Sequence, residues 1–193
     1  MQLPWGLQLN ADQFVRVCQA NPDAVLELTA DGQLIAMTPT GSETGARNNE
    51  LSFQLNRLAT ASGGWQGFDS STSFLLPDGS ALSPDASLVR MDRWQALSPE
   101  QRRGFVPLCP ELVVELATAS DDGPRGISAL RQKMETYRAH GAQLGWLLLP
   151  EQRAVEIWRA GATSSERQDA AVRLGGGELF AGLELDLAPI WEV

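Results

Sequence analysis

The chain has 193 residues, of which 43% are hydrophobic and 20% charged, an ordinary composition for a globular protein. At this length we expect one domain over residues 1–193, with a core at about 24–160 and a C-terminal extension of short strands. The net charge of −9 disfavours broad non-specific binding to nucleic acid, which needs many basic groups against phosphate, but does not exclude a local patch of arginines.

Neither a membrane segment nor a secretion signal is expected. No apolar run approaches the roughly 20 residues that a membrane span needs. Residues 1–6 contain no basic segment ahead of an apolar one, which disfavours a signal peptide. Two cysteines and the single histidine, His140, are too few for a disulfide framework or a structural zinc site. We therefore expect a cytoplasmic protein.

The first half of the chain predicts two helices and five short strands. The helices are expected at 11–20 and 43–61, with Ser42 as the N-cap of the second and Gly63-Gly64 at its end. The dipeptide Asp31-Gly32 is typical of a hairpin turn. The strands are expected at 24–29, 34–38, 65–68, 73–76 and 84–89.

The second half predicts a strand-rich pattern around one helix. Residues 92–104 indicate helical turns and a polar loop, and 126–140 a helix. Loops are expected at 120–124 and 159–168, and strands at 112–116, 144–149 and 154–158, with short strands within 174–187. The alternation over 154–158 is typical of a strand near an edge. The element order predicts a mixed α/β fold with one core sheet.

Two carboxylates lie at the ends of two apolar runs. Asp85 directly precedes the run 86–89, and Glu115 lies within the run 112–116. Carboxylate oxygens are the ligands that Mg²⁺ prefers, and phosphodiester hydrolases commonly use such an ion. The alternative is a surface turn aspartate and an ordinary strand-end glutamate. Spacing alone does not choose between the two interpretations.

Three further charged residues are candidates. Lys133, the only lysine, lies on the flank of the core face of the helix 126–140, from which it can reach a strand end and stabilise negative charge. A solvated helix lysine is the commoner alternative. Glu43 and Glu50 lie on one side of the helix 43–61, and either could act as an extra metal ligand or orient water. Glu43 could instead complement the helix dipole, and Glu50 could pair with an arginine.

Five stretches of the chain form a specific order: 68–72 (FDSST), 83–86 (SPDA), 110–116 (PELVVEL), 130–137 (LRQKMETY) and 141–150 (GAQLGWLLLP). Together they resemble the Uma-type family of restriction-endonuclease-like proteins, long catalogued as a domain of unknown function, within the PD-(D/E)XK nuclease superfamily. The resemblance covers nearly the whole chain.

The resemblance implies a restriction-endonuclease-like αβββαβ core with a mixed central sheet flanked by helices, preceded by an N-terminal helix and hairpin. It also implies a site for Mg²⁺, or Mn²⁺, held by Asp85 and Glu115. Glu43 corresponds to the helix glutamate of the superfamily. The superfamily lysine falls at Ala117 here, and Lys133 on the following helix takes its place.

The implied activity is that of a metal-dependent endonuclease acting on DNA. Two alternatives remain open: a catalytically inert nuclease fold used for binding or assembly, and a nuclease acting on RNA or small nucleotides. Superfamily members often dimerise, so a homodimer is a further expectation, and no membrane partner is expected.

Overall fold

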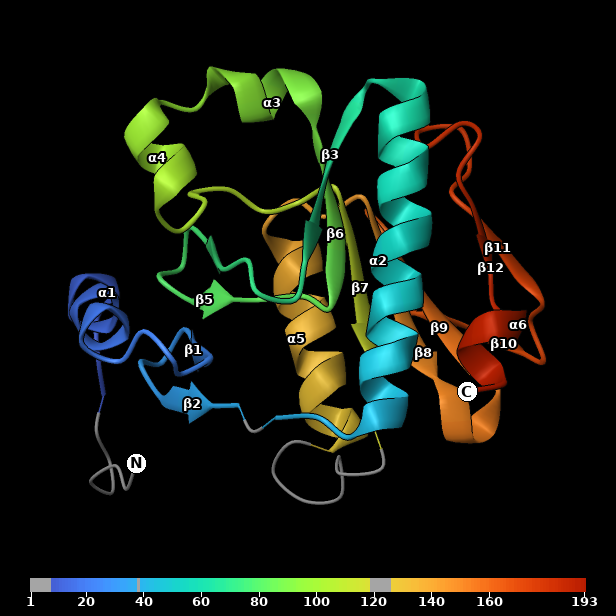
Figure 1. Cartoon of the computed structure of the whole chain (residues 1–193), viewed down its shortest axis with the longest axis horizontal. Helices are drawn as coiled ribbons and strands as arrows, with labels where there is room; N and C mark the ends of the chain where they lie inside the picture. Colours follow the sequence, from blue (N-terminus) through green and yellow to red (C-terminus); the bar gives the residue numbers. More distant parts are fainter. Residues whose placement is uncertain (1–7, 38, 119–125) are drawn as a thin grey trace.

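A mixed sheet of six strands forms the centre of the fold in the computed structural model, which describes residues 8–37, 39–118 and 126–193 (Figure 1). The strand order is β10-β9-β8-β7-β6-β3, with β7 and β8 parallel and the other neighbours antiparallel. The bounds are β3 Trp65–Asp69, β6 Ala86–Arg90, β7 Leu112–Leu116, β8 Leu144–Leu149, β9 Ala154–Arg159 and β10 Glu166–Asp169. Every residue of β7 and β8 is buried, as in the central strands of a sheet covered on both faces.

Two long helices cover opposite faces of this sheet. Helix α2 (Ser42–Ser62) packs on one face together with the C-terminal β11 (Arg173–Gly175), β12 (Glu184–Asp186) and α6 (Ala188–Trp191), and α5 (Ile127–Ala139) packs on the other (Figure 1). In β7 the side chain of Val114 joins the α2 cluster, and that of Val113 joins the α5 cluster. The order α2, β3, β6, β7, α5, β8 is the αβββαβ core, which confirms the predicted fold class.

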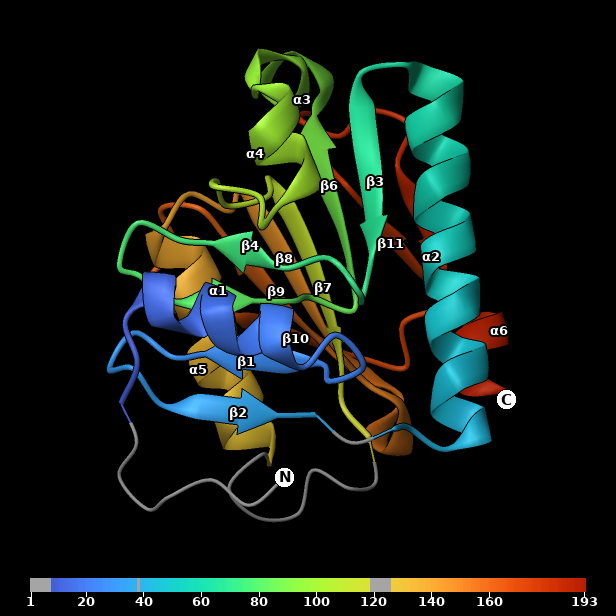
Figure 2. The ribbon, with the colours of Figure 1, turned by 60° about the vertical axis from the view of Figure 1, so that its left-hand side comes forward.

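A second, smaller sheet lies beside the core on the side of α5 (Figure 2). Its strand order is β2-β1-β5-β4, with bounds β1 Leu26–Leu28, β2 Leu34–Ala36, β4 Phe74–Leu75 and β5 Ala81–Leu82. Helix α1 (Ala11–Ala20) packs Phe14 against Leu26 and Leu28. Gly32 has φ +83° in the β1–β2 turn, and a Cβ there would lie 2.7 Å from the carbonyl oxygen of Leu9, so the turn requires glycine.

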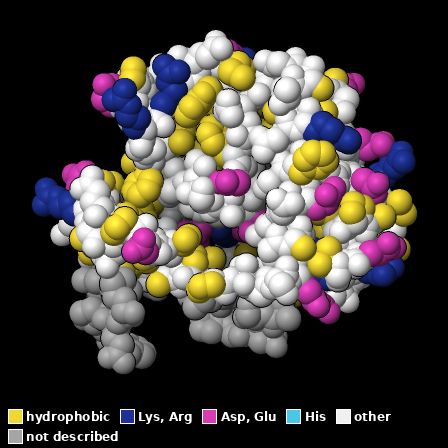
Figure 3. Space-filling view, in the orientation of Figure 1, with side chains coloured by type: hydrophobic (Ala, Val, Ile, Leu, Met, Phe, Trp, Pro, Cys, Tyr) yellow, Lys and Arg dark blue, Asp and Glu magenta, His cyan; other side chains and the backbone are white. Residues whose placement is uncertain are grey.

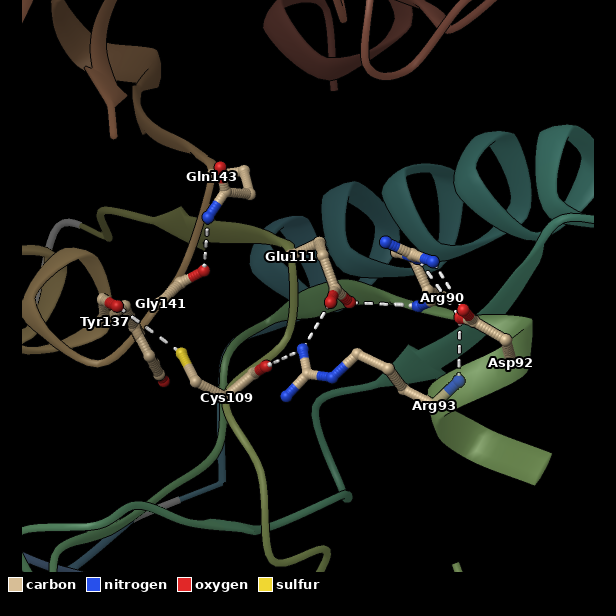
Figure 4. A network of polar contacts seen from close by, with 8 residues as sticks. All are labelled: Arg90, Asp92, Arg93, Cys109, Glu111, Tyr137, Gly141 and Gln143. Carbon is tan, nitrogen blue, oxygen red and sulfur yellow. Dashed lines mark hydrogen bonds and ion pairs between the residues drawn. The ribbon is translucent and has the colours of Figure 1, made fainter. Parts of the chain in front are cut away.

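The 3₁₀ turn η1 (Pro150–Gln152) joins β8 to β9 at the end of the sheet where β7 finishes. At the opposite end of the sheet, the connection between β6 and β7 contains α3 (Met91–Ala96) and α4 (Pro99–Arg103). Here Glu111, just before β7, accepts a hydrogen bond from the backbone N–H of Arg90 at 2.9 Å and forms an ion pair with Arg93 (Figure 4). Arg93 also donates to the carbonyl oxygen of Cys109 at 3.1 Å. Burial raises the pKa of the Cys109 thiol to about 12, so this cysteine remains an unreactive core residue.

The predicted helices and strands agree with the structure to within two residues at each end, but β5, η1, β10 and α6 were not predicted. Ser42 is the first residue of α2 rather than its cap, and the N-cap Gly41 has no side chain to accept a bond. The strand 154–158 is interior, because the segment read as a loop contains the edge strand β10. All four β10 residues are exposed, so no apolar alternation revealed it.

The predicted loop 120–124 and the end of the predicted strand at Thr38 lie outside the described residues. Within the part of the chain that the structure describes, no helix has the length and apolarity needed to cross a membrane.

The packing of α2 predicts a contrast between two positions on the same helix. Leu51 is fully buried, whereas Phe53 is 57% exposed. We expect Leu51→Ala to lower the free energy of unfolding by about 2–5 kcal/mol through lost burial and a cavity. Phe53→Ala should change it by less than about 1 kcal/mol. Urea unfolding followed by circular dichroism measures both, and equal effects would contradict the observed rotation of α2.

Candidate active site

Lys133 extends from α5 into a cluster of acidic side chains. Its Nζ lies 2.8 Å from Oε1 of Glu27 and 2.9 Å from Oε1 of Glu115. It also donates to the carbonyl oxygen of Ser83 at 2.9 Å. An ammonium group has three hydrogens, so these three acceptors satisfy it completely. Lys133 is the only lysine in the sequence, and its side chain is 12% exposed.

The position of Lys133 follows from the packing of α5 on the sheet. Met134 and Tyr137 are the buried residues of the helix, and Lys133 precedes Tyr137 by one helical turn, on the flank of the same face. Gly145 of β8 lies under the helix, since a Cβ there would lie 2.4 Å from Cε of Met134. The helix therefore approaches the sheet closely enough for the lysine to reach β7.

Strand alternation brings Glu115 to the same face of the sheet. Val113 and Ala117 belong to the core cluster under α5, and Glu115 lies between them in the alternation of β7. The hydroxyl of Tyr137 donates to Oε1 of Glu115 at 3.2 Å. A lysine at position 117 would emerge on this face as well, so Lys133 delivers an amine to the same side of β7 from the helix instead.

Asp85 lies directly before β6 and is held by both of its oxygens. Oδ2 accepts a hydrogen bond from the backbone N–H of Leu116 at 2.8 Å, and Oδ1 accepts one from Nδ2 of Asn48 at 3.1 Å. The loop before it is also fixed, because the N–H of Ser83 donates to Oε1 of Glu27 at 2.7 Å. Asp85 is therefore tied to the residue that follows Glu115, and both carboxylates lie at the same end of the β6–β7 pair.

The structure brings together three of the four predicted site residues: Asp85, Glu115 and Lys133. Glu43 lies exposed in the first turn of α2, and within residues 8–37, 39–118 and 126–193 no hydrogen bond or ion pair joins it to the other three. Glu50 accepts a bond from Gln54 at 2.8 Å. A role for Glu43 stays a prediction.

Three residues of the cluster were not predicted as site residues. Glu27 is buried in β1 between two buried leucines, and this placement of a carboxylate in an apolar strand was the available signal. Tyr137 lies near the end of the predicted helix 126–140, and its hydroxyl group was the available signal. Asn48 gave no signal in the sequence beyond its place on the predicted helix.

The cluster holds more carboxyl groups than basic groups. With Glu27, Asp85 and Glu115 ionised, three carboxylates surround one ammonium. Burial, opposed by Lys133 and reinforced by Asp85 and Glu27, raises the pKa of Glu115 to about 8. Burial likewise raises the pKa of Asp85, although the Leu116 amide and Lys133 oppose it. Burial lowers the pKa of Lys133, but Glu115 and Glu27 outweigh it and the pKa is raised, so the lysine is charged.

A space-filling view shows a hollow between the small N-terminal sheet and α2 (Figure 3). A basic group lies at its floor, flanked by acidic groups. The start of β6 and the body of α5 lie between the same elements in Figure 1, so the hollow leads toward the acidic cluster.

Comparison with known proteins identifies the family. The family model Uma2, described as "Putative restriction endonuclease", matches residues 11–188. The chain belongs to the Uma2 family. A solved structure described as a "putative nuclease belonging to DUF820" from Anabaena variabilis ATCC 29413 matches with a TM-score of 0.75 and 19% identity, over 95% of this chain and 97% of that one. At this identity the likeness shows a shared fold. No curated protein matches the chain.

The raised pKa of Glu115 predicts how stability depends on pH in this Uma2 protein. The folded state binds the Glu115 proton more tightly than the unfolded chain, where the pKa has its ordinary value of 4.5. Stability present at low pH is therefore lost as the pH rises through about 8. Urea unfolding in EDTA should give a free energy of unfolding that falls between about pH 5 and pH 9.

Glu115→Gln should flatten this slope, whereas Glu166→Gln on the exposed β10 should leave it unchanged. A wild-type slope that Glu115→Gln leaves intact would show that another group causes it.

The shared ammonium predicts strong coupling between Lys133 and Glu27. Lys133→Met alone leaves buried carboxylates without a cation and should cost about 3–5 kcal/mol of stability. Adding Glu27→Gln should recover part of that loss. A double-mutant cycle by urea unfolding measures the coupling, with the exposed pair Arg173 and Glu184, expected to couple by less than about 1 kcal/mol, as control. Additive effects at Lys133 and Glu27 would contradict the shared charge.

Proposed function

We propose that this protein is a divalent-cation-dependent nuclease that hydrolyses phosphodiester bonds of DNA at the site formed by Asp85, Glu115 and Lys133. The observation that carries the proposal is the buried contact of 2.9 Å between the only lysine of the chain and Glu115, next to a second strand-end carboxylate. Membership of a family described as a restriction endonuclease supports nuclease chemistry, and the same description favours DNA as substrate.

The chemistry of the donor set fits a hard divalent cation. The candidate ligands are carboxylate oxygens, and the cluster has more carboxyl groups than basic groups, so that its ionised carboxylates can balance an ion of charge +2. Among the residues that the structure describes, no three His, Cys, Asp or Glu side chains form a group able to hold a metal ion. Mg²⁺ is commonly held by one or two carboxylates, with water and substrate phosphate completing the shell. Asp85 and Glu115 would hold the ion, which polarises the phosphate and lowers the pKa of water when bound.

The chain's own residues supply a fixed positive charge and its support. The ammonium of Lys133 stabilises the negative charge that develops on the phosphate oxygens, because it lies in a site with little solvent screening. Glu27 fixes the direction of the lysine side chain, and Tyr137 fixes the orientation of Glu115. Since all three ammonium hydrogens already have acceptors, a phosphate oxygen must replace one of these acceptors during the reaction.

The same saturation favours a second candidate function. A lysine whose three hydrogens are bound within the protein is also what a nuclease fold used only for binding would keep as a structural cross-link. This candidate predicts folded, nucleic-acid-binding protein without metal-dependent cleavage.

Cleavage assays separate the two candidates. We expect Mg²⁺ or Mn²⁺ to support nicking of supercoiled plasmid DNA, and EDTA to stop it. Asp85→Asn and Glu115→Gln should each reduce the rate by about 100-fold or more, because each replaces a carboxylate that would hold the cation with a neutral amide. Glu166→Gln on β10 serves as the matched control, and single-stranded DNA and RNA of the same length test the substrate class.

Cleavage that survives both carboxylate substitutions would refute the assignment of the site. Binding of DNA by the wild-type protein without cleavage in either metal would favour the inert candidate.

A further inference from the structure

Helix α2 presents Asn48 to the candidate active site. Its Nδ2 donates to Oδ1 of Asp85 at 3.1 Å, whereas its own Oδ1 is buried and has no hydrogen-bond partner. Among the described residues, the other buried side-chain nitrogen and oxygen atoms without a hydrogen-bond partner are the hydroxyls of Ser73 and Ser87 and the indole nitrogen of Trp158. Of these four side chains, Asn48 is the one bonded to a carboxylate of the cluster.

The position of Asn48 is set by the contacts of α2. Asn48 lies one turn before Leu51, which is buried against the sheet, so both project from the same side of the helix. The neighbouring Arg47 is buried and donates from Nε to the carbonyl oxygen of Ile190 at 3.0 Å. One turn beyond Leu51, Gln54 exchanges two bonds with the backbone of Asp186, at 3.0 and 2.8 Å. These contacts fix the rotation of α2 and hold the amide beside Asp85.

An unsatisfied buried acceptor costs free energy, on the order of 1–3 kcal/mol. A side-chain amide has a donor and an acceptor end of nearly the same shape, and a half-turn of the group exchanges them. Without a cation the nitrogen faces Asp85, because N–H is the end that a carboxylate attracts. A cation beside Asp85 reverses this preference, because amide oxygens are ligands of Mg²⁺ and Ca²⁺.

We propose that Asn48 is a third protein ligand of the divalent cation, with its Oδ1 binding the ion that Asp85 and Glu115 hold. In the protein without the ion, Nδ2 of Asn48 donates a hydrogen bond to Asp85 instead. This inference rests on the cation dependence in the proposed function, and it adds an uncharged oxygen from α2 to the two carboxylates of the central sheet.

The alternative role for Asn48 is that of a hydrogen-bond donor alone. The two roles predict opposite effects on cation binding. As a donor, Asn48 competes with the ion for Oδ1 of Asp85, so its removal leaves binding unchanged or tighter. As a ligand, Asn48 contributes an oxygen, so its removal weakens binding and its replacement by a carboxylate strengthens it.

Calorimetric titration of the full chain with Mn²⁺ tests the proposal without any activity assay. We expect Asn48→Ala to bind about tenfold more weakly than wild type. Asn48→Asp should bind more tightly than Asn49→Asp, which adds the same charge at the next, exposed position of the helix. Asn48→Ala binding as tightly as wild type, or Asn48→Asp gaining nothing over Asn49→Asp, would overturn the proposal and leave the proposed function standing. A wild-type chain that binds no Mn²⁺ would overturn both.

The side-chain amide of Asn48 gives a second readout on the wild-type chain, which can refute the proposal even if a variant fails to fold. In ¹⁵N spectra, Mg²⁺ should shift the Asn48 NH₂ signals, because they lose the bond to Asp85. The NH₂ signals of Asn56, which donates to the carbonyl oxygen of Ser52 at 2.9 Å, should stay in place. Unchanged Asn48 signals at a Mg²⁺ concentration that saturates binding would exclude the exchange of nitrogen for oxygen.

Discussion

The burial of one ammonium group is the constraint on which this site depends. A charge removed from water costs several kcal/mol unless close partners compensate it. The partners of Lys133 come from three separate parts of the chain: Glu27 in β1, Ser83 in the loop before β6, and Glu115 in β7. Because Glu27 also accepts the N–H of Ser83, the lysine ties α5, the small sheet and the central sheet to a single arrangement. This contact therefore helps to position the start of β6 and the end of β7.

The distribution of charge along β7 distinguishes its two ends. At the start of the strand, Glu111 has its own arginine partner, Arg93 (Figure 4). On the same sheet, Glu156 of β9 is paired in the same way with Arg131. At the end of β7, by contrast, Glu115 shares one lysine with Glu27, and Asp85 lies nearby. Buried carboxylates matched one to one with arginine are structural, whereas an unmatched excess creates affinity for a further cation. This contrast supports the proposed site at the end of β7, which the sequence pattern singled out.

Much of the fold and of the candidate site could be predicted from hydrophobic periodicity and from the positions of strand ends, because both are local properties of the sequence. The apolar runs located β7 and β8, the alternation within β7 puts Glu115 toward α5, and the helical repeat puts Lys133 near Tyr137. The contribution of Glu27 depends on how the small sheet docks beside α5, which no local pattern encodes. Whether Glu43 or Asn48 lies beside Asp85 depends on the rotation of α2 about its axis. That rotation is fixed by contacts with the distant C-terminal segment. The edge strand β10 has no buried face and so no readable alternation.

The position of the lysine on α5 brings the small sheet into the site, because Glu27 of β1 contacts Lys133. A lysine at position 117 would follow Glu115 along β7 and could share the environment of the strand. The side chain of a lysine on α5 instead crosses the space between helix and sheet. Its ammonium group then lies beside Glu115, the carboxylate of the αβββαβ core. β1 supplies the second carboxylate, Glu27, and the same carboxylate anchors Ser83, two residues before Asp85. With the amine on the helix, the small sheet becomes part of the site, because Glu27 supplies one of the three partners of Lys133 and also fixes Ser83 in the loop before Asp85.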